Sequence, residues 1–529
     1  MNLIRQRIIS LRSRARDIQG SLRRWALYAD AFSHESKEAF LTRWTPNERS
    51  DYPRDVEQTR PRLRPVQVHV EMLGTWFNCI VEAIDEQLNQ AQSQLEQGRV
   101  PECLATLADV ENRLVGPTRE TLAFATRTFA QRVAPTTCHR MTALDALIRS
   151  LYLPTIKNAV QRGLLAKECL SRTPLSILAG SAAEESAQWR HHAVGSAAIG
   201  RFIPISLVAV RQELLAEPWN LVSIAHDVGV QIYSDLDLAW EIVQKLSSEA
   251  TLTGVTPETA TVWARAHETL FADVFGVLQL GPAYVSGMIE RLSQSAEGPF
   301  VATPSSPLPP YVRWHVMLQM LTLLSYADEA RERITQMHAL CGDPQQVAQR
   351  LGAGWMQLIG EARAVAGLVA FSPLQKLGGA RIIDLVPPML TSEMQAAVRV
   401  REVLSGADEN CTEDSEFEWA KSVRDVPAHL ALAGLRMAFD AAPQQERAAQ
   451  LAVRFWCLTQ YLTRENSTIR EREDRENAPA IETLRSIARR GAAPIIASGA
   501  AAGIACGTFG IGGPVGSATA FGGAAVATA

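Results

Sequence analysis

The 529-residue sequence lacks several patterns that would assign a function directly. It contains eight cysteines but no C-x-x-C pair, which argues against both a disulfide framework and a thiolate zinc site. The N-terminus also lacks the apolar run of about 7–15 residues that a secretory signal requires. We therefore expect a cytoplasmic protein in a reducing compartment.

Motifs for nucleotide chemistry are missing as well. The sequence contains no P-loop, nucleophile elbow or dinucleotide fingerprint in a suitable context. Its formal net charge is −4, with 20% charged and 47% hydrophobic residues. This composition is typical of soluble globular proteins and provides no overall attraction to nucleic acid. We expect no nucleic-acid partner, so any recognition must rest on local features.

Hydrophobic periodicity predicts a mostly α, multi-domain protein with a small β-sheet. The clearest strand signal is the β-branched run within "RFIPISLVAVRQELL" at 201–215. The segment 294–310 is rich in Pro and Ser and indicates a linker or a long ordered loop. We divide the chain into a helical N-terminal region (1–180), a core that contains the strand (181–293), the linker (294–310), a helical region (311–465), a charged tether (466–490) and an apolar Gly/Ala-rich tail (491–529).

The first 24 residues contain seven arginines interleaved with leucine and isoleucine. Two interpretations fit this pattern. A basic amphipathic helix would bind an anionic membrane or partner, whereas the solvated face of an ordinary helix would need no partner.

The tail over 491–529 contains no charged residue. Gly499, Gly503 and Gly507 recur every fourth position, which would place a smooth strip on one face of a helix. We expect a conditional membrane element, released when a regulatory protease cuts the preceding tether. The alternative is a flexible Gly/Ala segment with no role at a membrane.

The segment "SIAHDVGVQIYSDL" (223–236) and the downstream "FADVFG" (271–276) carry the most specific pattern. Together with the preceding strand, they resemble the core of the gluzincin class of zinc metallopeptidases. In that class H-E-x-x-H places two zinc-binding imidazoles one helical turn apart, and the Glu polarises the zinc-bound water. The resemblance implies a zincin-like α+β core within 181–293, and its motifs cover only residues 201–285.

The resemblance assigns each residue of the first motif a position. His226 lies at the first zinc-ligand position, and Asp227 lies where the catalytic Glu would be. Val230 occupies the second ligand position, so the second imidazole is missing.

A later helix in the gluzincin class supplies a Glu ligand and, four residues on, an Asp that holds a histidine ligand from behind. Asp273 matches that Asp, which places Thr269 at the Glu ligand position. The neighbouring acid, Glu268, lies about 100° around the helix from Thr269.

These departures predict a protein that has lost catalysis and binds no cofactor. Catalytic zinc sites use three protein ligands, and only His226 remains of the three. Asp227 is one methylene shorter than Glu and would misplace a water. We expect action through binding a protein partner or through conformation. The alternative is an active zinc-dependent metallopeptidase or other metallohydrolase with unusual ligands from His226, Asp227, Glu268 and Asp273.

The letters "HDVG" also resemble the His-Asp pair of metal-dependent phosphohydrolases of the HD class. His192, His226, Asp227 and Asp273 would be the metal ligands on that scheme. That fold is wholly helical, so the run "IPISLVAV" argues against it.

Overall fold

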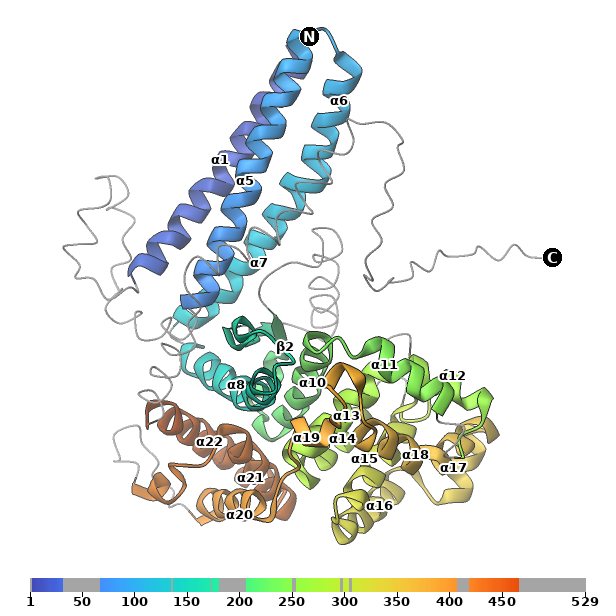
Figure 1. Cartoon of the computed structure of the whole chain (residues 1–529). Coiled ribbons are helices and arrows are strands. Elements are labelled where there is room, and N and C mark those ends of the chain that lie inside the picture. Colours follow the sequence, from blue (N-terminus) through green and yellow to red (C-terminus); the bar gives the residue numbers. More distant parts are fainter. Residues whose placement is uncertain are drawn as a thin grey trace.

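The computed structural model describes residues 2–31, 67–134, 137–171, 173–179, 206–249, 254–294, 298–303, 307–406 and 418–465. These residues form a mostly helical protein with a two-stranded parallel sheet, which confirms the predicted fold class. Long helices form a stalk that projects from a rounded helical body (Figure 1).

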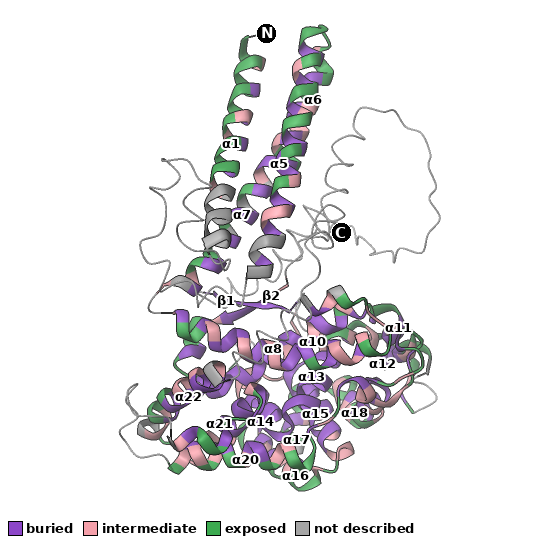
Figure 2. Cartoon of the chain, turned by 60° about the vertical axis from the view of Figure 1, so that its left-hand side comes forward, coloured by how far each residue is buried: buried purple, intermediate pink, exposed green. Residues whose placement is uncertain are grey.

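The stalk is a bundle with its own hydrophobic core. Its helices are α1 (Asn2–Ala31), α5 (Gln67–Glu96), α6 (Val100–Asp109) and α7 (Gly116–Val133), with a π-helical turn over Val110–Val115. In α1 the buried residues Ile8, Leu11, Ala15 and Ile18 recur at three- and four-residue spacing, as expected for one face of a helix. They pack with α5 and α6, while the outer surface of the stalk is largely exposed (Figure 2).

The body contains the remaining elements. Its α-helices are α8 (Cys138–Gln161), α10 (Ile224–Asp235), α11 (Ala239–Gln244), α12 (Pro257–Arg265), α13 (His267–Leu280), α14 (Pro282–Ser293), α15 (Pro310–Leu323), α16 (Ala327–Cys341), α17 (Pro344–Leu351), α18 (Ala353–Phe371), α19 (Ile382–Leu385), α20 (Thr391–Gly406), α21 (Ala428–Ala441) and α22 (Gln445–Glu465). Shorter 3-10 turns cover Lys167–Ser171, Gln212–Leu215, Pro218–Ser223, Gln375–Leu377 and Glu418–Val423, and a π turn covers Lys245–Glu249.

One buried cluster extends through the body from Met141 to Leu462. The described parts of 181–293 and 311–465 both contribute to it, so these two regions share a hydrophobic core. Within the segment between them Leu308 is fully buried, and the Tyr311 amide donates a hydrogen bond to the Pro299 carbonyl. The described part of 294–310 is therefore an ordered loop packed on the body.

The parallel sheet lies between the stalk and the body. Strand β1 (Leu175–Ala179) pairs with β2 (Leu207–Arg211) in the register Leu175 to Leu207 and Leu178 to Val210. Because side chains alternate between the faces of a strand, Leu175 and Leu207 meet the stalk core. Leu178 and Val210 lie on the other face and join the core of the body.

The strand β2 was expected, since it lies within the 201–215 segment, but β1 was not. We expected helix throughout 1–180, and the strand at Leu175–Ala179 corrects this. The run "LSILA" is too short to distinguish strand from buried helix by periodicity. Its pairing partner follows about thirty residues later, so no local pattern marks it.

A buried ion pair joins the stalk to the body. The Arg132 guanidinium on α7 donates to both carboxylate oxygens of Asp145 on α8, at 2.9 and 2.7 Å. Asp145 also accepts from the Ser176 hydroxyl and amide of β1, at 2.7 and 2.9 Å. Arg132 completes the joint by donating to the backbone carbonyls of Thr128 and Ser176.

Candidate functional site

The helix with the first motif is held in place by its apolar face. Ile224, Val228 and Ile232 are fully buried at four-residue spacing, as the periodicity predicts. Gly229 lies on the side that faces α13, where a Cβ atom would approach the Ala272 Cα to 3.0 Å. The lack of a side chain at this position lets the two helices cross closely.

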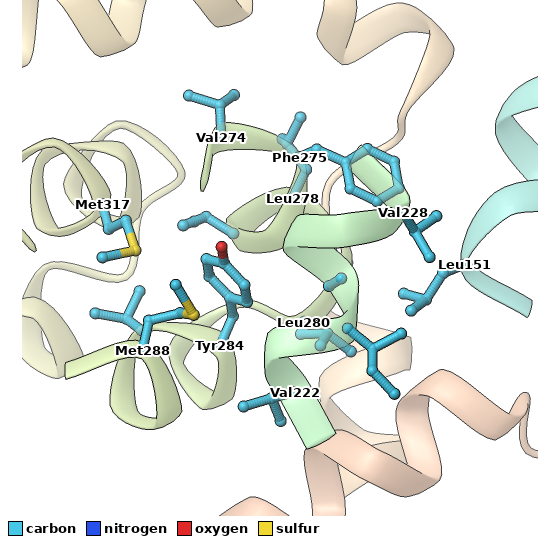
Figure 3. Close-up of a cluster of buried hydrophobic side chains, with 14 of the residues drawn as sticks. Leu151, Val222, Val228, Val274, Phe275, Leu278, Leu280, Tyr284, Met288 and Met317 are labelled. Carbon is cyan, nitrogen blue, oxygen red and sulfur yellow. The ribbon is translucent and has the colours of Figure 1, made fainter. Parts of the chain in front are cut away.

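The second motif lies on α13, which is buried along most of its length. The helix ends at Leu280 because Gly281 has a φ of 55°, and Pro282 then begins α14. Figure 3 shows Val228 of α10, Phe275 of α13 and Tyr284 of α14 in one buried cluster. These three closely packed helices carry His226, Asp273 and Tyr284 of the site.

Asp273 is the centre of these polar groups and is completely buried. Its Oδ1 atom lies 3.1 Å from the Nδ1 atom of His226, across the helix crossing. Arg313 on α15 donates to both carboxylate oxygens, at 2.8 and 2.9 Å. The Tyr284 hydroxyl donates to Oδ1 at 3.0 Å.

This arrangement keeps Asp273 ionised. Burial alone would raise the pKa of Asp273, but the Arg313 charge and the His226 hydrogen bond outweigh burial and lower it. The pKa of Tyr284 is raised well above its ordinary value, mainly by burial and also by the Asp273 charge. Tyr284 therefore stays protonated and acts as a donor to the carboxylate.

The ionised carboxylate also fixes the tautomer of His226. A carboxylate can only accept hydrogen bonds, so the His226 Nδ1 atom must carry the proton between them. A neutral His226 then has its free lone pair on Nε2. The side chain is 19% exposed, so the residue lies at the edge of the core. Zinc-binding histidines are held in this way by a carboxylate behind the ring.

Asp227, which the resemblance places where the catalytic Glu would be, is buried. Burial raises the pKa of its carboxyl, and the charges of Arg291, His226 and Arg313 oppose this rise. The side chain therefore lies in the interior of the body, where an ionised carboxylate is disfavoured.

The resemblance assigns the remaining ligand positions to Val230 and Thr269. Val230 and Thr269 are half-buried, and neither side chain offers a strong zinc ligand. The Glu268 side chain is exposed, although surrounding protein raises the pKa of its carboxyl and the His226 charge partly offsets this. Within the described ranges no three His, Cys, Asp or Glu side chains are grouped so that they could hold a metal ion.

The structure adds partners that the motifs did not reveal. Arg313 follows Asp273 by 40 residues, beyond the Pro-rich segment, and Tyr284 follows it by 11 residues. No sequence pattern links either residue to the motif. A second pair lies at the other end of the helix crossing, where the Tyr233 hydroxyl is 2.6 Å from the His267 Nδ1 atom. Burial raises the pKa of Tyr233, so its hydroxyl stays protonated, and the tautomer of His267 decides which of the two atoms donates.

Other sequence-based assignments fall outside the described residues. They include His192, which the HD-class interpretation requires, and Gly499, Gly503 and Gly507 of the apolar tail. In the part of the chain that the structure covers, none of the helices combines the length and apolarity needed to cross a bilayer. Among the cysteines that the structure describes, Cys103 and Cys341 are buried free thiols.

Comparisons with known proteins add no further assignment. A scan against protein-family models finds no match, and searches of curated proteins and of solved structures find none.

Proposed function

We propose that this chain is a metallopeptidase-like protein without catalytic activity, which acts by binding a protein partner or by changing conformation. The observation that carries the proposal is the set of bonds around Asp273. His226 keeps the orientation that a metal ligand requires, while the other two ligand positions hold Val230 and Thr269. Of the three protein ligands that the resemblance requires, only the His226 imidazole is present.

Asp273 contributes to stability without any metal. The Arg313 guanidinium forms a bidentate ion pair with its carboxylate, and Tyr284 and His226 fill the remaining positions. Breaking a buried pair of this kind leaves an uncompensated charge in the interior. Packing and charge neutralisation therefore suffice to explain why these residues lie together.

A variant with both missing ligand residues restored, called the refilled variant, tests the metallopeptidase resemblance directly. The double variant Val230→His with Thr269→Glu restores both missing ligands on the facing helices α10 and α13. We expect this variant to bind zinc with one ion per chain in isothermal titration calorimetry, because three protein ligands would then converge.

Two outcomes would contradict the proposal. If the wild-type chain binds stoichiometric zinc and His226→Ala abolishes that binding, the active alternative is correct. If the refilled variant folds but binds no zinc, the resemblance does not describe the geometry of these helices. The variant Val230→Leu with Thr269→Val serves as a control, since it changes the same positions without adding a ligand.

The apolar tail supports a second role, for which the sequence is the evidence. Between Pro494 and Pro514 lie 19 residues without a charge. As a helix they would span about 28 Å, close to the hydrocarbon thickness of a bilayer at roughly 30 Å. We propose that cleavage in the tether frees this tail, so that the protein is a latent effector with conditional membrane association.

Expression of residues 464–529 in bacteria, beside the intact chain, tests the tail. We expect the fragment to slow growth and to resist extraction from the membrane fraction by high salt, whereas the intact chain does neither. A fragment that remains soluble and harmless would end this second proposal and leave the first one unaffected.

A further inference from the structure

The N-terminal helix α1 presents two different faces. Its apolar face, formed by Ile8, Leu11, Ala15 and Ile18, is buried against the other stalk helices. This face is already occupied, so α1 does not lie in a membrane as a free amphipathic helix would. Any partner must contact the outer face, which is largely exposed along the stalk (Figure 2).

A row of arginines runs along one side of that outer face. Arg5, Ile9, Arg12 and Arg16 follow one another at spacings of four, three and four residues, which aligns them along the helix. The row extends about 16 Å at 1.5 Å per residue. Arg5 and Arg16 are exposed, and Arg12 is half-buried and donates to the Asn89 side chain of α5.

The arginines of α1 differ in their partners. Arg7 and Arg14 both form ion pairs with Glu111, at 2.8 and 2.9 Å, so a carboxylate of the stalk already neutralises part of their charge. For Arg5 and Arg16 the described residues provide no ion pair. These two guanidinium groups are therefore available to an external anion.

We propose that this outer face of α1, defined by Arg5, Ile9, Arg12 and Arg16, docks the stalk onto an anionic lipid surface. A straight row of arginines along a rod matches a flat layer of phosphate headgroups. Each basic side chain near such a surface contributes attraction of about 1 kcal/mol.

Exposed apolar side chains favour lipid over nucleic acid. Ile9 is 66% exposed within the row, and Leu3 is 81% exposed near the start of the helix. Such side chains insert at the boundary between headgroups and acyl chains, while the flanking arginines remain with the phosphates. The neighbouring helix α5 contains five acidic residues and no lysine or arginine. Arg12 donates to Asn89 of α5, so α5 flanks the row, and its acidic residues would repel a polyanion that wraps around the stalk.

The test uses the full chain and sedimentation with vesicles. Wild-type protein should bind vesicles of mixed phosphatidylglycerol and phosphatidylcholine, and should not bind phosphatidylcholine alone. The double variant Arg5→Gln with Arg16→Gln should partition about 30-fold more weakly, which corresponds to the loss of two arginine contributions. The variant Ile9→Ser should bind several-fold more weakly, with unchanged thermal stability because the side chain is exposed.

A matched control removes the same charge elsewhere. Arg331→Gln with Arg363→Gln lies on exposed sites of α16 and α18, and it should bind like the wild type. All variants keep the apolar tail, so a difference between them reports on α1.

Three results would overturn the proposal. They are no binding of the wild-type chain to the anionic vesicles, equal binding of the Arg5/Arg16 variant, and tighter binding of the wild type to duplex RNA than to the vesicles.

Discussion

Two buried arginine–aspartate pairs can be compared within this molecule. One is Arg132–Asp145 at the joint between stalk and body, and the other is Arg313–Asp273 at the candidate site. Both are bidentate and almost fully buried. Neither residue of the joint belongs to the metallopeptidase-like motifs, so a buried pair of this kind needs no catalytic explanation.

The two pairs differ in what completes them. At the joint, Asp145 accepts its other hydrogen bonds from the amide and hydroxyl of Ser176, which lies on strand β1. At the site, Asp273 is completed by the side chains of His226 and Tyr284. Only the site extends to a partly exposed imidazole. The feature that resembles an enzyme is therefore His226, and the buried pair behind it is a stabilising element.

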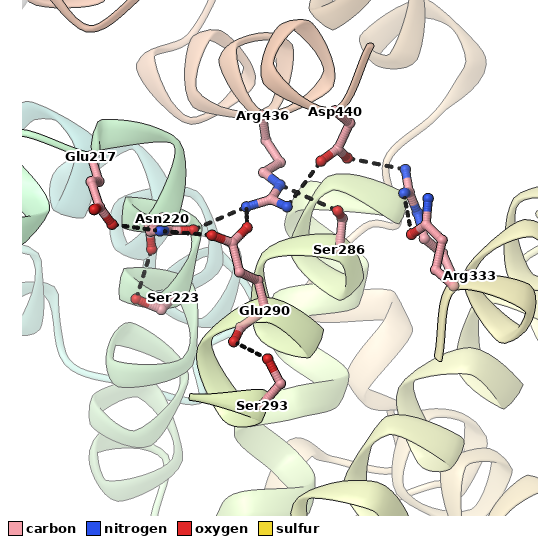
Figure 4. Close-up of polar contacts among 10 residues, drawn as sticks. Glu217, Asn220, Ser223, Ser286, Glu290, Ser293, Arg333, Arg436 and Asp440 are labelled. Carbon is pink, nitrogen blue, oxygen red and sulfur yellow. Dashed lines mark hydrogen bonds and ion pairs between the residues drawn. The ribbon is translucent and has the colours of Figure 1, made fainter. Parts of the chain in front are cut away.

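A third arginine network also connects helices of the body, and it lies nearer the surface. Arg436 on α21 donates to Glu290 at 2.6 Å and to Asn220 at 3.0 Å, and it also pairs with Asp440 (Figure 4). Glu290 is 30% exposed, so solvent screens part of this network. Arginine networks recur as connections between helices of the body.

The largest expected effect comes from removing either buried carboxylate. Asp273→Ala and Asp145→Ala should each lower the free energy of unfolding by about 3–5 kcal/mol, because a buried guanidinium loses its counter-ion. Chemical denaturation of both variants measures this. The exposed pair of Arg331 with Asp328 provides the control, and Asp328→Ala should cost less than about 1 kcal/mol. If Asp273→Ala behaves like that control, the site does not stabilise the fold.

Acid should weaken the joint more than the site. His69 on α5 is buried beside the joint, where its Nε2 atom lies 2.8 Å from the Thr173 carbonyl. Burial lowers the pKa of His69 from 6.5 to about 4. Because the unfolded chain binds the proton more readily, the stability that neutral His69 provides is complete above pH 6.5. It is lost as the pH falls toward 4, by about 3 kcal/mol in total.

Melting temperatures between pH 7.5 and pH 4.5 measure this dependence. His69→Gln retains a donor for the Thr173 carbonyl and should make the profile shallower. His315 and His429, whose pKa values burial also lowers to about 4, should keep part of the slope. Asp273 remains ionised over the same range because its pKa is lowered. An unchanged profile in the His69 variant would mean that other groups cause the acid sensitivity.

Packing at the helix crossing gives an intermediate effect. Val228→Ala removes a fully buried side chain and should cost about 1–3 kcal/mol. The same truncation at half-buried Val230, one half-turn away on α10, should cost less. Thermal unfolding of the two variants compares them. Equal losses would indicate that Val230 also packs into the core.

The smallest effect is expected at Asp227. Burial penalises its ionised form, so Asp227→Asn should leave the melting temperature at neutral pH unchanged or slightly raised. Biological activity should also persist, because we assign no chemistry to this carboxylate. A large loss of activity in a folded variant would favour the active alternative.

The sequence predicted local features better than distant ones. Helix periodicity predicted the burial of Leu221, Ile224, Val228 and Ile232, and the strand at β2 lies within the expected segment. The strand β1 could not be predicted because its five residues form a strand only by pairing with β2, which lies far along the chain.

The candidate site shows the same limit. The motifs singled out His226 and Asp273, which the structure brings together. Arg313 and Tyr284 could not be identified, because only the packing of α14 and α15 against α13 brings them to the carboxylate. Burial of Asp227 likewise depends on elements outside its own helix, so no spacing along α10 reveals it.

The most direct test of the central claim is the metal content of the protein as purified, without added metal. Elemental analysis of the wild-type chain should find no stoichiometric zinc or manganese, and His226→Ala should give the same result. One zinc or manganese ion per chain, lost in the His226→Ala variant, would contradict the account and identify a working metal site.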